Sequence, residues 1–495
     1  MANQYLIGWS EVDMTPDKKI SLAGQFYERV SEYVETPLTA TAMAIASGDN
    51  HVIFCSADLV SVGTKLLADV REIVAKERAE INTDALIINA THTHTSFVYA
   101  DRSDKTSGSS LSILRGYMPE NCRYIDRVPT TEDVMTPEEA SEHIANKVAK
   151  ACIEAFDNLA PASFANEFGR AAVGMNRRVC YDDGSAKMWG DTKTVNFTHL
   201  EGGNDNGIEL VYTFDESGKK LTGVVANIAC PSQVVEQRSY ISSDYWGKVK
   251  ILLREKYGDD IKVLGLGGAG GDQCPRDLVR WVDPETPIDD PNVIRTDVTP
   301  RRADPSMYDI KGTWKIGKRV VNEISDVYEE IERTISEGEL IHKKIMLDLP
   351  LRRVTPSEKA NAEKAIREFF NEHPGDINYI DTAAMHVHAG TLGRYEYQQK
   401  NNICTIEIHI VKIGNIVFAT NPYELFLDYG NQIRALSLAE QTFIIPLCNG
   451  SAGYLPTKKA EEGGHYSAYV SSGTVGHVGG EMLVRKTVEE INKLF

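Results

Sequence analysis

The chain has 495 residues, of which 42% are hydrophobic and 25% are charged. This composition is that of an ordinary globular protein and excludes disorder for most of the chain. Lys and Arg number 53 and Asp and Glu 71, which leaves a net charge of −18. An acidic excess of this size argues against nucleic acid or an anionic membrane as partner, because both bind basic patches.

The N-terminal segment MANQYLIGWSEVDMTPDKK lacks the basic and apolar regions of a signal peptide, and no apolar run is long enough to span a bilayer. The eight cysteines are scattered without a CxxC pair, which indicates reduced thiols. We therefore predict a cytoplasmic protein that acts on a small molecule. Assembly into a homo-oligomer stays open.

Short apolar runs rich in Val, Ile and Leu recur along the chain. In order they are HVIFCSADL, ALIINATHTHTS, GVVANIACPSQ, KVLGLGGAGGDQCP, NIVFATNPYEL and FIIPLCNGSAGYLP. Near-continuous apolar runs of this length are typical of strands covered on both faces. They predict an α/β fold with a mixed β-sheet core flanked by helices.

Each of these runs ends in side chains that can do chemistry. The residues at the ends are Asp58, His92 with His94, Cys230 with Gln233, Asp272 with Cys274, Glu424 and Tyr454. In sheets of this kind, ligands bind beyond the carboxyl ends of the strands. We therefore expect these side chains to share one site.

Helices are predicted between the strands. Thr136-Pro137-Glu138-Glu139 has the pattern of an N-cap, a first-turn proline and a capping-box glutamate, and apolar residues follow it at helical spacing. The segments 311–337 and 356–372 each carry many charges and one apolar stripe, which predicts two further helices.

Two long polar stretches, 97–135 and 276–310, are rich in Pro, Gly and Asp and directly follow candidate site strands. Loops of this length in a compact protein are usually lids or binding loops, although a disordered excursion is the alternative. The sequence contains no internal repeat or linker. We therefore predict a single domain over residues 1–495.

The segment ATHTHTS places His92 and His94 two residues apart, so that both rings face the same side of an extended strand. This suits a metal with nitrogen ligands, or one ligand beside an acid/base group. Two rings that simply hydrogen-bond in a loop are an equally good interpretation. His386 and His388 repeat the spacing, and for them we expect an outward-facing strand.

The stretch GLGGAGGDQCPRD offers backbone N–H groups of residues 267–271 to an anion or a developing oxyanion. It is not a Walker loop, because no Gly-Lys-Ser/Thr follows. Cys274 at its end could be a nucleophile with a lowered pKa, or a small buried residue. Taken alone, Glu424 is typical of a helix N-terminus and Tyr454 of a buried ring.

Seven motifs occur in the order known from one family. They are GWSEVDMTP, ATHTHTS, GMNRR, ANIACPSQ with ISSDYWG, GGAGGDQCPR, NPYELF and NGSAGYLPT. Over nearly its whole length the chain resembles the catalytic domain of the neutral/alkaline ceramidases. The resemblance implies an α/β fold that holds one zinc ion and hydrolyses an amide.

Carried over position by position, the resemblance implies roles for individual residues. His92, Glu424 and Tyr454 would be metal ligands, and His94 would support them or orient substrate. Arg177 would contact the polar head of the substrate, together with Gly270 and Gly271 of the glycine loop. Asp272 would hold that loop in place.

The sequence departs from the family at two of these positions. Cys230 stands where the family has its second histidine ligand, so that either the thiolate replaces the imidazole or the metal is held differently, or not at all. Cys274 stands where the family has its nucleophilic serine. It either keeps a nucleophile or leaves the attack to a metal-bound hydroxide.

A further departure concerns the substrate. Family ceramidases carry an export signal and a C-terminal immunoglobulin-like domain, and we expect neither here. This favours a small, water-soluble substrate over a membrane lipid.

The leading hypothesis is therefore a zinc-dependent hydrolase that cleaves an amide of a small N-acyl compound, with His94 moving a proton. A second hypothesis changes the bond to an ester, lactone or glycosidic linkage, and for a glycosidase Asp58, Asp244 or Asp272 would act beside Glu424. The third is a non-catalytic ligand-binding relative, which the missing histidine supports.

Overall fold

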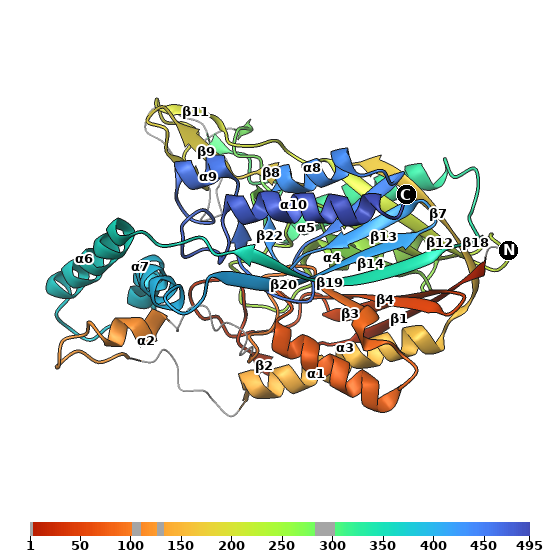
Figure 1. Ribbon diagram of the computed structural model, residues 1–495, viewed down its shortest axis with the longest axis horizontal. Helices are drawn as coiled ribbons and strands as arrows, with labels where there is room; N and C mark the ends of the chain where they lie inside the picture. Colours follow the sequence, from red (N-terminus) through yellow and green to blue (C-terminus); the bar gives the residue numbers. More distant parts are fainter. Residues whose placement is uncertain (1–2, 101–109, 126–132, 283–301) are drawn as a thin grey trace.

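In the computed structural model, residues 3–100, 110–125, 133–282 and 302–495 are described. A larger and a smaller β-sheet pack face to face, and helices cover the outer face of each (Figure 1). The larger sheet has the strand order β14-β13-β12-β7-β1-β3-β4-β5. Its strands are β1 (Asn3–Asp13), β3 (Thr39–Ser47), β4 (Asn50–Ala57), β5 (Leu86–Ala90), β7 (Ala160–Arg170), β12 (Gly207–Asp215), β13 (Leu221–Ile228) and β14 (Lys262–Gly267).

The smaller sheet has the order β19-β20-β21-β23. Its strands are β19 (Leu340–Pro350), β20 (Ile403–Ile413), β21 (Ile416–Thr420) and β23 (Gln441–Ile445). Alternate residues of the strands divide between two cores. In β4, Val52 and Phe54 enter the core between the sheets, whereas Ile53 and Cys55 face the helices. A strand buried on both faces needs apolar residues at every position, which is why these segments read as continuous apolar runs.

Helices cover the outside of both sheets. In Figure 1, α1 (Thr64–Glu77) and α3 (Pro137–Asp157) lie below β1, β3 and β4, and α10 (His477–Asn492) lies on the opposite side of the molecule. The other half of the larger sheet packs on α4 (Asp244–Tyr257) and α5 (Asp309–Tyr328), and α8 (Leu427–Leu436) joins α10 on the smaller sheet. The predicted capping box is confirmed, because Thr136 and Glu139 bond reciprocally at the start of α3.

A group of three helices projects from one end of the molecule (Figure 1). These are α2 (Ser110–Arg115), α6 (Pro356–Glu372) and α7 (Tyr379–Tyr397), which share a separate small core. The predicted helix 356–372 is confirmed, whereas the helix expected over 311–337 ends at Tyr328. The strand expected around His386 and His388 was wrong, because both lie in α7, where alternating burial has no meaning.

Short elements complete the described structure. They are β2 (Lys19–Ile20), β6 (Val134–Met135), β8 (Met175–Asn176), β9 (Arg178–Tyr181), β10 (Ala186–Met188), β11 (Phe197–Leu200), β15 (Gln273–Cys274), β16 (Trp281–Val282), β17 (Arg302–Ala303), β18 (Glu337–Gly338), β22 (Glu424–Leu425), β24 (Tyr454–Leu455), the 3₁₀ turn η1 (Thr83–Ala85) and α9 (Lys458–Gly463). Of the stretches expected to be loops, 101–109, 126–132 and 283–301 lie outside the described residues. No helix within the described ranges is long and apolar enough to cross a membrane.

The predicted apolar runs form β4, β5, β13, β14, β21 and β23, and the mixed α/β class is confirmed. Three parallel pairs, β4 with β5, β13 with β14 and β21 with β23, bring carboxyl ends to common edges. Beyond β21 and β23 the chain forms the parallel pair β22 and β24, in which Glu424 lies opposite Tyr454. The register of this pair therefore places a carboxylate and a phenol side by side.

Candidate functional site

His92 directly follows β5 and has a left-handed backbone conformation, with φ of 63°. Its Nδ1 lies 2.6 Å from the carbonyl oxygen of Val60, and its Nε2 lies 3.5 Å from Oε2 of Glu424. Because a carbonyl can only accept, Nδ1 carries the hydrogen, and Nε2 presents its lone pair toward Glu424. This tautomer, fixed by a backbone carbonyl, is the arrangement typical of a metal-binding histidine.

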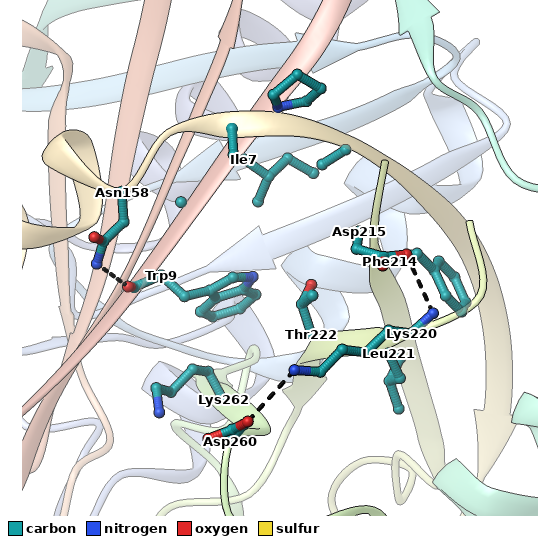
Figure 2. A pocket seen from close by; sticks show the side chains of 14 residues that line it. Ile7, Trp9, Asn158, Phe214, Asp215, Lys220, Leu221, Thr222, Asp260 and Lys262 are labelled. Carbon is teal, nitrogen blue, oxygen red and sulfur yellow. Dashed lines mark hydrogen bonds and ion pairs between the residues drawn. The ribbon is translucent and has the colours of Figure 1, made fainter. Parts of the chain in front are cut away.

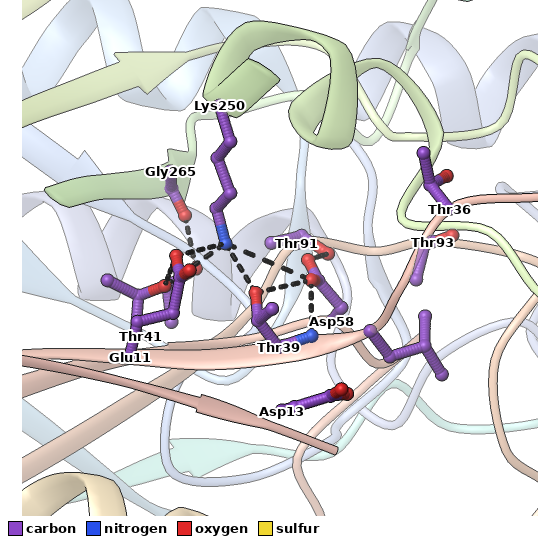
Figure 3. A network of polar contacts seen from close by, with 12 residues as sticks. Glu11, Asp13, Thr36, Thr39, Thr41, Asp58, Thr91, Thr93, Lys250 and Gly265 are labelled. Atoms are coloured by element: carbon purple, nitrogen blue, oxygen red, sulfur yellow. Dashed lines mark hydrogen bonds and ion pairs between the residues drawn. The ribbon is translucent and has the colours of Figure 1, made fainter. Parts of the chain in front are cut away.

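A buried polar network holds Thr91, the residue before His92 (Figure 3). The hydroxyl of Thr91 donates to Asp58 at 3.1 Å, and Asp58 also accepts from the backbone and hydroxyl of Thr39. The ammonium group of Lys250 lies 4.0 Å from Asp58 and 3.5 Å from Glu11. The network ties β1, β3, β4 and α4 to the end of β5, so that the backbone at His92 is held from several sides.

His94 lies between His92 and a second carboxylate. Its Nε2 is 3.3 Å from Nε2 of His92, and its Nδ1 is 3.3 Å from Oε2 of Glu236. Glu236 in turn accepts a hydrogen bond of 3.0 Å from the hydroxyl of Tyr308. Burial lowers the pKa of His94, so its imidazole is neutral near neutral pH. A neutral ring whose Nδ1 faces a carboxylate has its hydrogen on Nδ1 and its lone pair on Nε2, where it can accept a proton.

The loop after β2 covers His94. The amino group Nη2 of Arg29 donates to the carbonyl oxygens of Ala23 and His94, at 2.5 and 2.7 Å. Gly24 has a φ of 94°, and a Cβ there would stand 2.4 Å from the His94 ring. Only glycine allows the loop to lie this close, and this fixes the ring of His94 from above.

Glu424 and Tyr454 form the other wall of the site. Burial opposes ionisation of Glu424, but the neighbouring His92, Tyr454 and Arg177 side chains outweigh it and lower the pKa of the carboxyl. Burial raises the pKa of Tyr454 well above its usual range, so the phenol keeps its proton in the absence of a cation. Its hydroxyl lies 3.5 Å from that of Tyr466, whose ring packs edge-on against it.

Arg177 reaches the same place from the segment between β8 and β9. Its Nη1 donates to Oε1 of Gln233 at 3.0 Å, and its Nη2 donates to the carbonyl oxygen of Gly271 at 3.1 Å and lies 3.5 Å from the hydroxyl of Tyr454. The side chain is buried. A guanidinium group therefore lies against both the glycine loop and the Tyr454 phenol.

The glycine loop packs directly beneath Glu424. A Cβ on Gly271 would stand 2.4 Å from the carbonyl oxygen of Glu424, so the contact requires glycine. The N–H groups of Gly268 and Gly271 donate to the carbonyls of Ile228 and Leu425. The prediction that the amide of Gly271 steadies an oxyanion is therefore corrected, because that donor is already used within the fold.

Asp272 has the structural role expected of it. One carboxylate oxygen accepts from the backbone N–H of Leu427 at 2.9 Å and the other from the side chain of Asn176 at 2.9 Å. It thus joins the glycine loop to the start of α8 and to β8. Burial raises the pKa of its carboxyl to about 6.

Cys274 is fully buried, and its Sγ donates to the carbonyl oxygen of Arg276 at 3.2 Å. Burial raises the pKa of this thiol to about 11 despite the nearby cations Arg177 and Arg276. The lowered pKa that a thiolate nucleophile would need is therefore absent, and the group is a protonated thiol near neutral pH. The interpretation as a small buried residue fits these contacts better.

Cys230 lines a small cavity of about 20 Å³ together with His92, Glu424 and the glycine loop. Its thiol faces the carbonyl oxygens of Val173 and Pro231, and burial raises its pKa well above the usual range. Within the described ranges, no three His, Cys, Asp or Glu side chains form a group that could hold a metal ion. The four-ligand set that includes Cys230 is therefore not assembled in this structure.

Three donors of the expected set lie next to one another. His92 supplies a nitrogen, Glu424 a carboxylate oxygen and Tyr454 a phenol oxygen, and catalytic zinc sites use three protein ligands and leave a fourth position open. The fixed tautomer of His92 is the observation that favours this set. The adjoining cavity has room for about one water molecule.

The carboxylates proposed for a glycosidase are engaged elsewhere. Asp58 belongs to the Lys250 network, and Asp272 joins the glycine loop to α8. Asp244 accepts from the backbone N–H groups of Val235 and Tyr245 at the start of α4. None of these three faces Glu424 across the small cavity, whose described lining contains no other carboxylate. The three carboxylates named for a glycosidase therefore do not pair with Glu424 across this cavity.

A larger cavity lies at the opposite ends of β13 and β14 and has a volume of about 320 Å³ (Figure 2). Its charged lining includes Lys220, Asp260 and Lys262, and the pair Lys220–Asp260 is exposed to solvent. Its lining includes neither histidine nor cysteine. The imidazole, phenol and guanidinium groups of the candidate site lie instead at the carboxyl ends of the strands, where the sequence predicted a site.

The structure thus brings His92, His94, Arg177, Glu424 and Tyr454 together. The sequence interpretation missed Glu236, Tyr308 and Tyr466. Glu236 follows the run ending in Gln233 by only three residues, and Tyr308 lies in the stretch 276–310 that was expected to form a binding loop. The positions of Glu236 and Tyr308 in the sequence could therefore have indicated that they belong to the site. Nothing in the sequence distinguished Tyr466.

Two packed sheets flanked by helices place a polar centre of imidazole, carboxylate, phenol and guanidinium at the strand ends, which is where ligands bind in α/β folds. Comparison with protein-family models finds no match, and comparison with curated proteins finds none either.

Solved structures do match. Neutral ceramidase from Pseudomonas aeruginosa superposes with a TM-score of 0.67 and 15% identity, over 99% of this chain and 74% of that one. A ceramidase complexed with C2 gives a TM-score of 0.66 at 14% identity, over 99% and 75%. The chain therefore has a neutral ceramidase-like fold, which confirms the resemblance drawn from the motifs at the level of the fold.

Proposed function

We propose that this chain is a metal-dependent hydrolase that cleaves the amide bond of a small, soluble N-acyl compound. One observation carries the proposal: His92, His94, Glu424, Tyr454 and Arg177, from distant parts of the chain, lie in a continuous series of contacts at the strand ends. The likeness of the fold to ceramidases supports an amide over other bonds.

His94 is proposed as the group that takes a proton from the attacking water. Its neutral ring offers Nε2, and Glu236 on Nδ1 would stabilise the imidazolium that forms. The proton would then pass from Nε2 to the leaving amine. Glu236 is itself fixed by Tyr308. This series of carboxylate, imidazole and water follows the logic of known catalytic triads.

Arg177 and Tyr454 are proposed to bind the substrate. The guanidinium group contacts its polar head, and the amide of Gly270 in the adjacent loop offers a hydrogen bond to a substrate oxygen. Because the site lies under the loop that carries Gly24 and Arg29, it excludes bulk water and strengthens these contacts.

Zinc is the metal that we propose, held by His92, Glu424 and Tyr454. When bound, it would polarise the substrate carbonyl and lower the pKa of a water molecule. Cys274 is proposed to support the glycine loop rather than to attack the substrate, because its thiol is buried and protonated.

The test is a metal assay combined with activity. Purified protein would be analysed for zinc and then assayed on N-acyl amino compounds and on matched esters, before and after treatment with a chelator. We expect about one zinc per chain, and we expect amide hydrolysis to disappear with the metal and return when zinc is added. Full activity of metal-free protein would remove the metal from the proposal.

A further inference from the structure

Gln233 has a buried donor that nothing in the described structure uses. Its side chain is 1% exposed, and its Oε1 accepts from Nη1 of Arg177 at 3.0 Å. Because a guanidinium group only donates, the amide atom that faces it must be the oxygen, which fixes the orientation of the amide. The other atom, Nε2, then has no hydrogen-bond partner among the described residues.

Arg177 is left in a similar state. It is 3% exposed, and its hydrogen-bond partners within the described residues are all neutral: the Gln233 amide, the Gly271 carbonyl and the Tyr454 hydroxyl. Its Nε has no partner in the described part of the chain. No carboxylate of the described residues lies at ion-pair distance, although Glu424 acts on it from further away.

Arg178, the next residue, is a buried arginine whose partners include a carboxylate. Arg178 is 0% exposed, and its Nε forms an ion pair of 2.8 Å with Glu201. Its remaining nitrogens donate to Ser467 and to three backbone carbonyls. Buried charges are normally paired, and buried donors are normally bonded, because leaving them without partners costs free energy. Arg177 and Gln233 depart from both rules at the candidate site.

We propose that the missing partner is a carboxylate on the substrate, bound by Arg177 and Gln233, so that the substrate class is N-acyl amino acids. The inference rests on the proposed amide hydrolysis. A carboxylate accepts several hydrogen bonds, and its negative charge would pair with the positive charge of the guanidinium group. Since Arg177 also touches Tyr454, the carboxylate would sit next to the scissile amide, as in an α-amino acid.

The test compares N-hexanoylglycine with N-hexanoylglycinamide, which differ only in the carboxylate. The wild-type protein should hydrolyse the acid with a kcat/KM about 100-fold above that of the amide, since a hydrogen-bonded charge is at stake. Gln233→Glu keeps the acceptor for Arg177 but replaces the free donor by a negative charge. It should lower kcat/KM for the acid about 100-fold and change that for the neutral compound less than about threefold.

Two further variants complete the comparison. Gln233→Leu removes the donor without adding charge and should cost the acid about tenfold. Gln399→Leu, at an exposed position just after α7, is the matched control and should leave both rates unchanged. Thermal unfolding of each variant shows whether it is folded. Equal rates on the two compounds in the wild-type protein would overturn the inference.

A binding measurement separates this inference from the proposed reaction. N-hexanoylglycine should raise the unfolding temperature of the wild-type protein, and N-hexanoylglycinamide should raise it less, whether or not either is cleaved. Stabilisation by the acid without turnover would keep the carboxylate site and refute the hydrolase. Equal stabilisation by both compounds, or by neither, would refute the carboxylate site.

Discussion

Residues of the candidate site adopt backbone conformations that most side chains avoid. His92 has a φ of 63°, and Leu447 and His465, in the loops that approach the site, have φ of 52° and 71°. Such conformations each cost on the order of 1 kcal/mol and persist only where the surroundings enforce them. At His92 the Val60 carbonyl and the Lys250 network supply that enforcement. The strain is thus explained by the requirement to point Nε2 at Glu424.

Glu424 is the residue on which the proposed metal site depends most directly. Glu424→Gln keeps the shape of the side chain but removes the negative charge beside His92. We expect kcat/KM for an N-acyl substrate to fall at least about 100-fold and bound zinc to be lost, because a neutral amide is a poor zinc ligand. Metal analysis and steady-state kinetics test this. Glu440→Gln, at an exposed carboxylate, is the control, and unchanged zinc in Glu424→Gln would contradict the assignment.

Substitution of Cys274 tests whether its thiol or a water molecule attacks the substrate. Since burial raises the pKa of its thiol to about 11, we expect Cys274→Ala to keep activity within about tenfold of the wild-type value. If Cys274 were the nucleophile, its removal would lower kcat by several orders of magnitude. Rates of Cys274→Ala and Cys274→Ser decide the matter. Activity abolished in the alanine variant and restored by serine would return the nucleophile to this position.

At the scale of elements, the site depends on how α4 is joined to the strands of the larger sheet. Lys250 of α4 reaches Glu11 of β1, Thr39 and Thr41 of β3, and Asp58 after β4. These groups are buried, and a buried charge that loses its partner is costly. The network thus fixes the end of β5 through contacts between elements that are far apart in sequence.

Lys250→Met measures this coupling. The substitution leaves Asp58 and Glu11 without their shared cation, although Arg254 still pairs with Glu11. We expect a loss of about 3 kcal/mol in the free energy of unfolding, measured by urea denaturation. Lys220→Met is the matched control, since its pair with Asp260 is exposed and worth about 0.5 kcal/mol or less. Equal effects of the two variants would show that the network contributes no more than a surface pair.

Asp244, the first residue of α4, gives the fold a specific pH dependence. Burial raises the pKa of its carboxyl from 3.8 to about 7, although the backbone N–H groups of Tyr245 and Val235 oppose the shift. The stabilising contribution of the protonated form is complete below about pH 4 and is lost as the pH rises through about 7. Asp244→Asn cannot ionise and, like aspartate, tolerates the left-handed backbone found there, with φ of 55°.

Between pH 4 and pH 8 we therefore expect the stability of Asp244→Asn relative to the wild-type protein to rise by about 4 kcal/mol. Urea denaturation at a series of pH values measures the difference. The exposed variant Asp260→Asn should show no such trend. A constant difference for Asp244→Asn across this range would mean that the carboxyl titrates at its ordinary pH.

At the scale of the whole molecule, the proposed metal joins segments from both sheets. His92 follows a strand of the larger sheet, whereas Glu424 and Tyr454 follow strands of the smaller one. A ligand that binds only the folded chain stabilises it. We expect added zinc to raise the unfolding temperature of chelator-treated protein by several degrees, and His92→Ala to abolish the rise. A rise that persists in His92→Ala would place the zinc elsewhere.

Local patterns in the sequence were sufficient to predict the class of fold and the side of the sheets on which the candidate site lies. The apolar runs predicted the strands correctly, because a strand buried on both faces needs apolar residues throughout. This requirement is a local property of the sequence. His92, Glu424 and Tyr454 were found for a related reason, since each stands where such a run stops. The helix start at Thr136 was likewise readable, because a capping box lies within four consecutive residues.

Which groups meet, and in which protonation state, became visible only in the folded arrangement. It placed Glu236 and Tyr308 against His94, put the thiol of Cys274 in a site where burial raises its pKa, and left Gln233 and Arg177 with donors that the described residues do not satisfy. The helix at His386 and His388 could not be predicted from the sequence. Their two-residue spacing favoured a strand, but packing against α2 and α6 stabilises a helix there. Ionisation and pairing depend on desolvation and on neighbours from remote segments, and neither is encoded in local patterns.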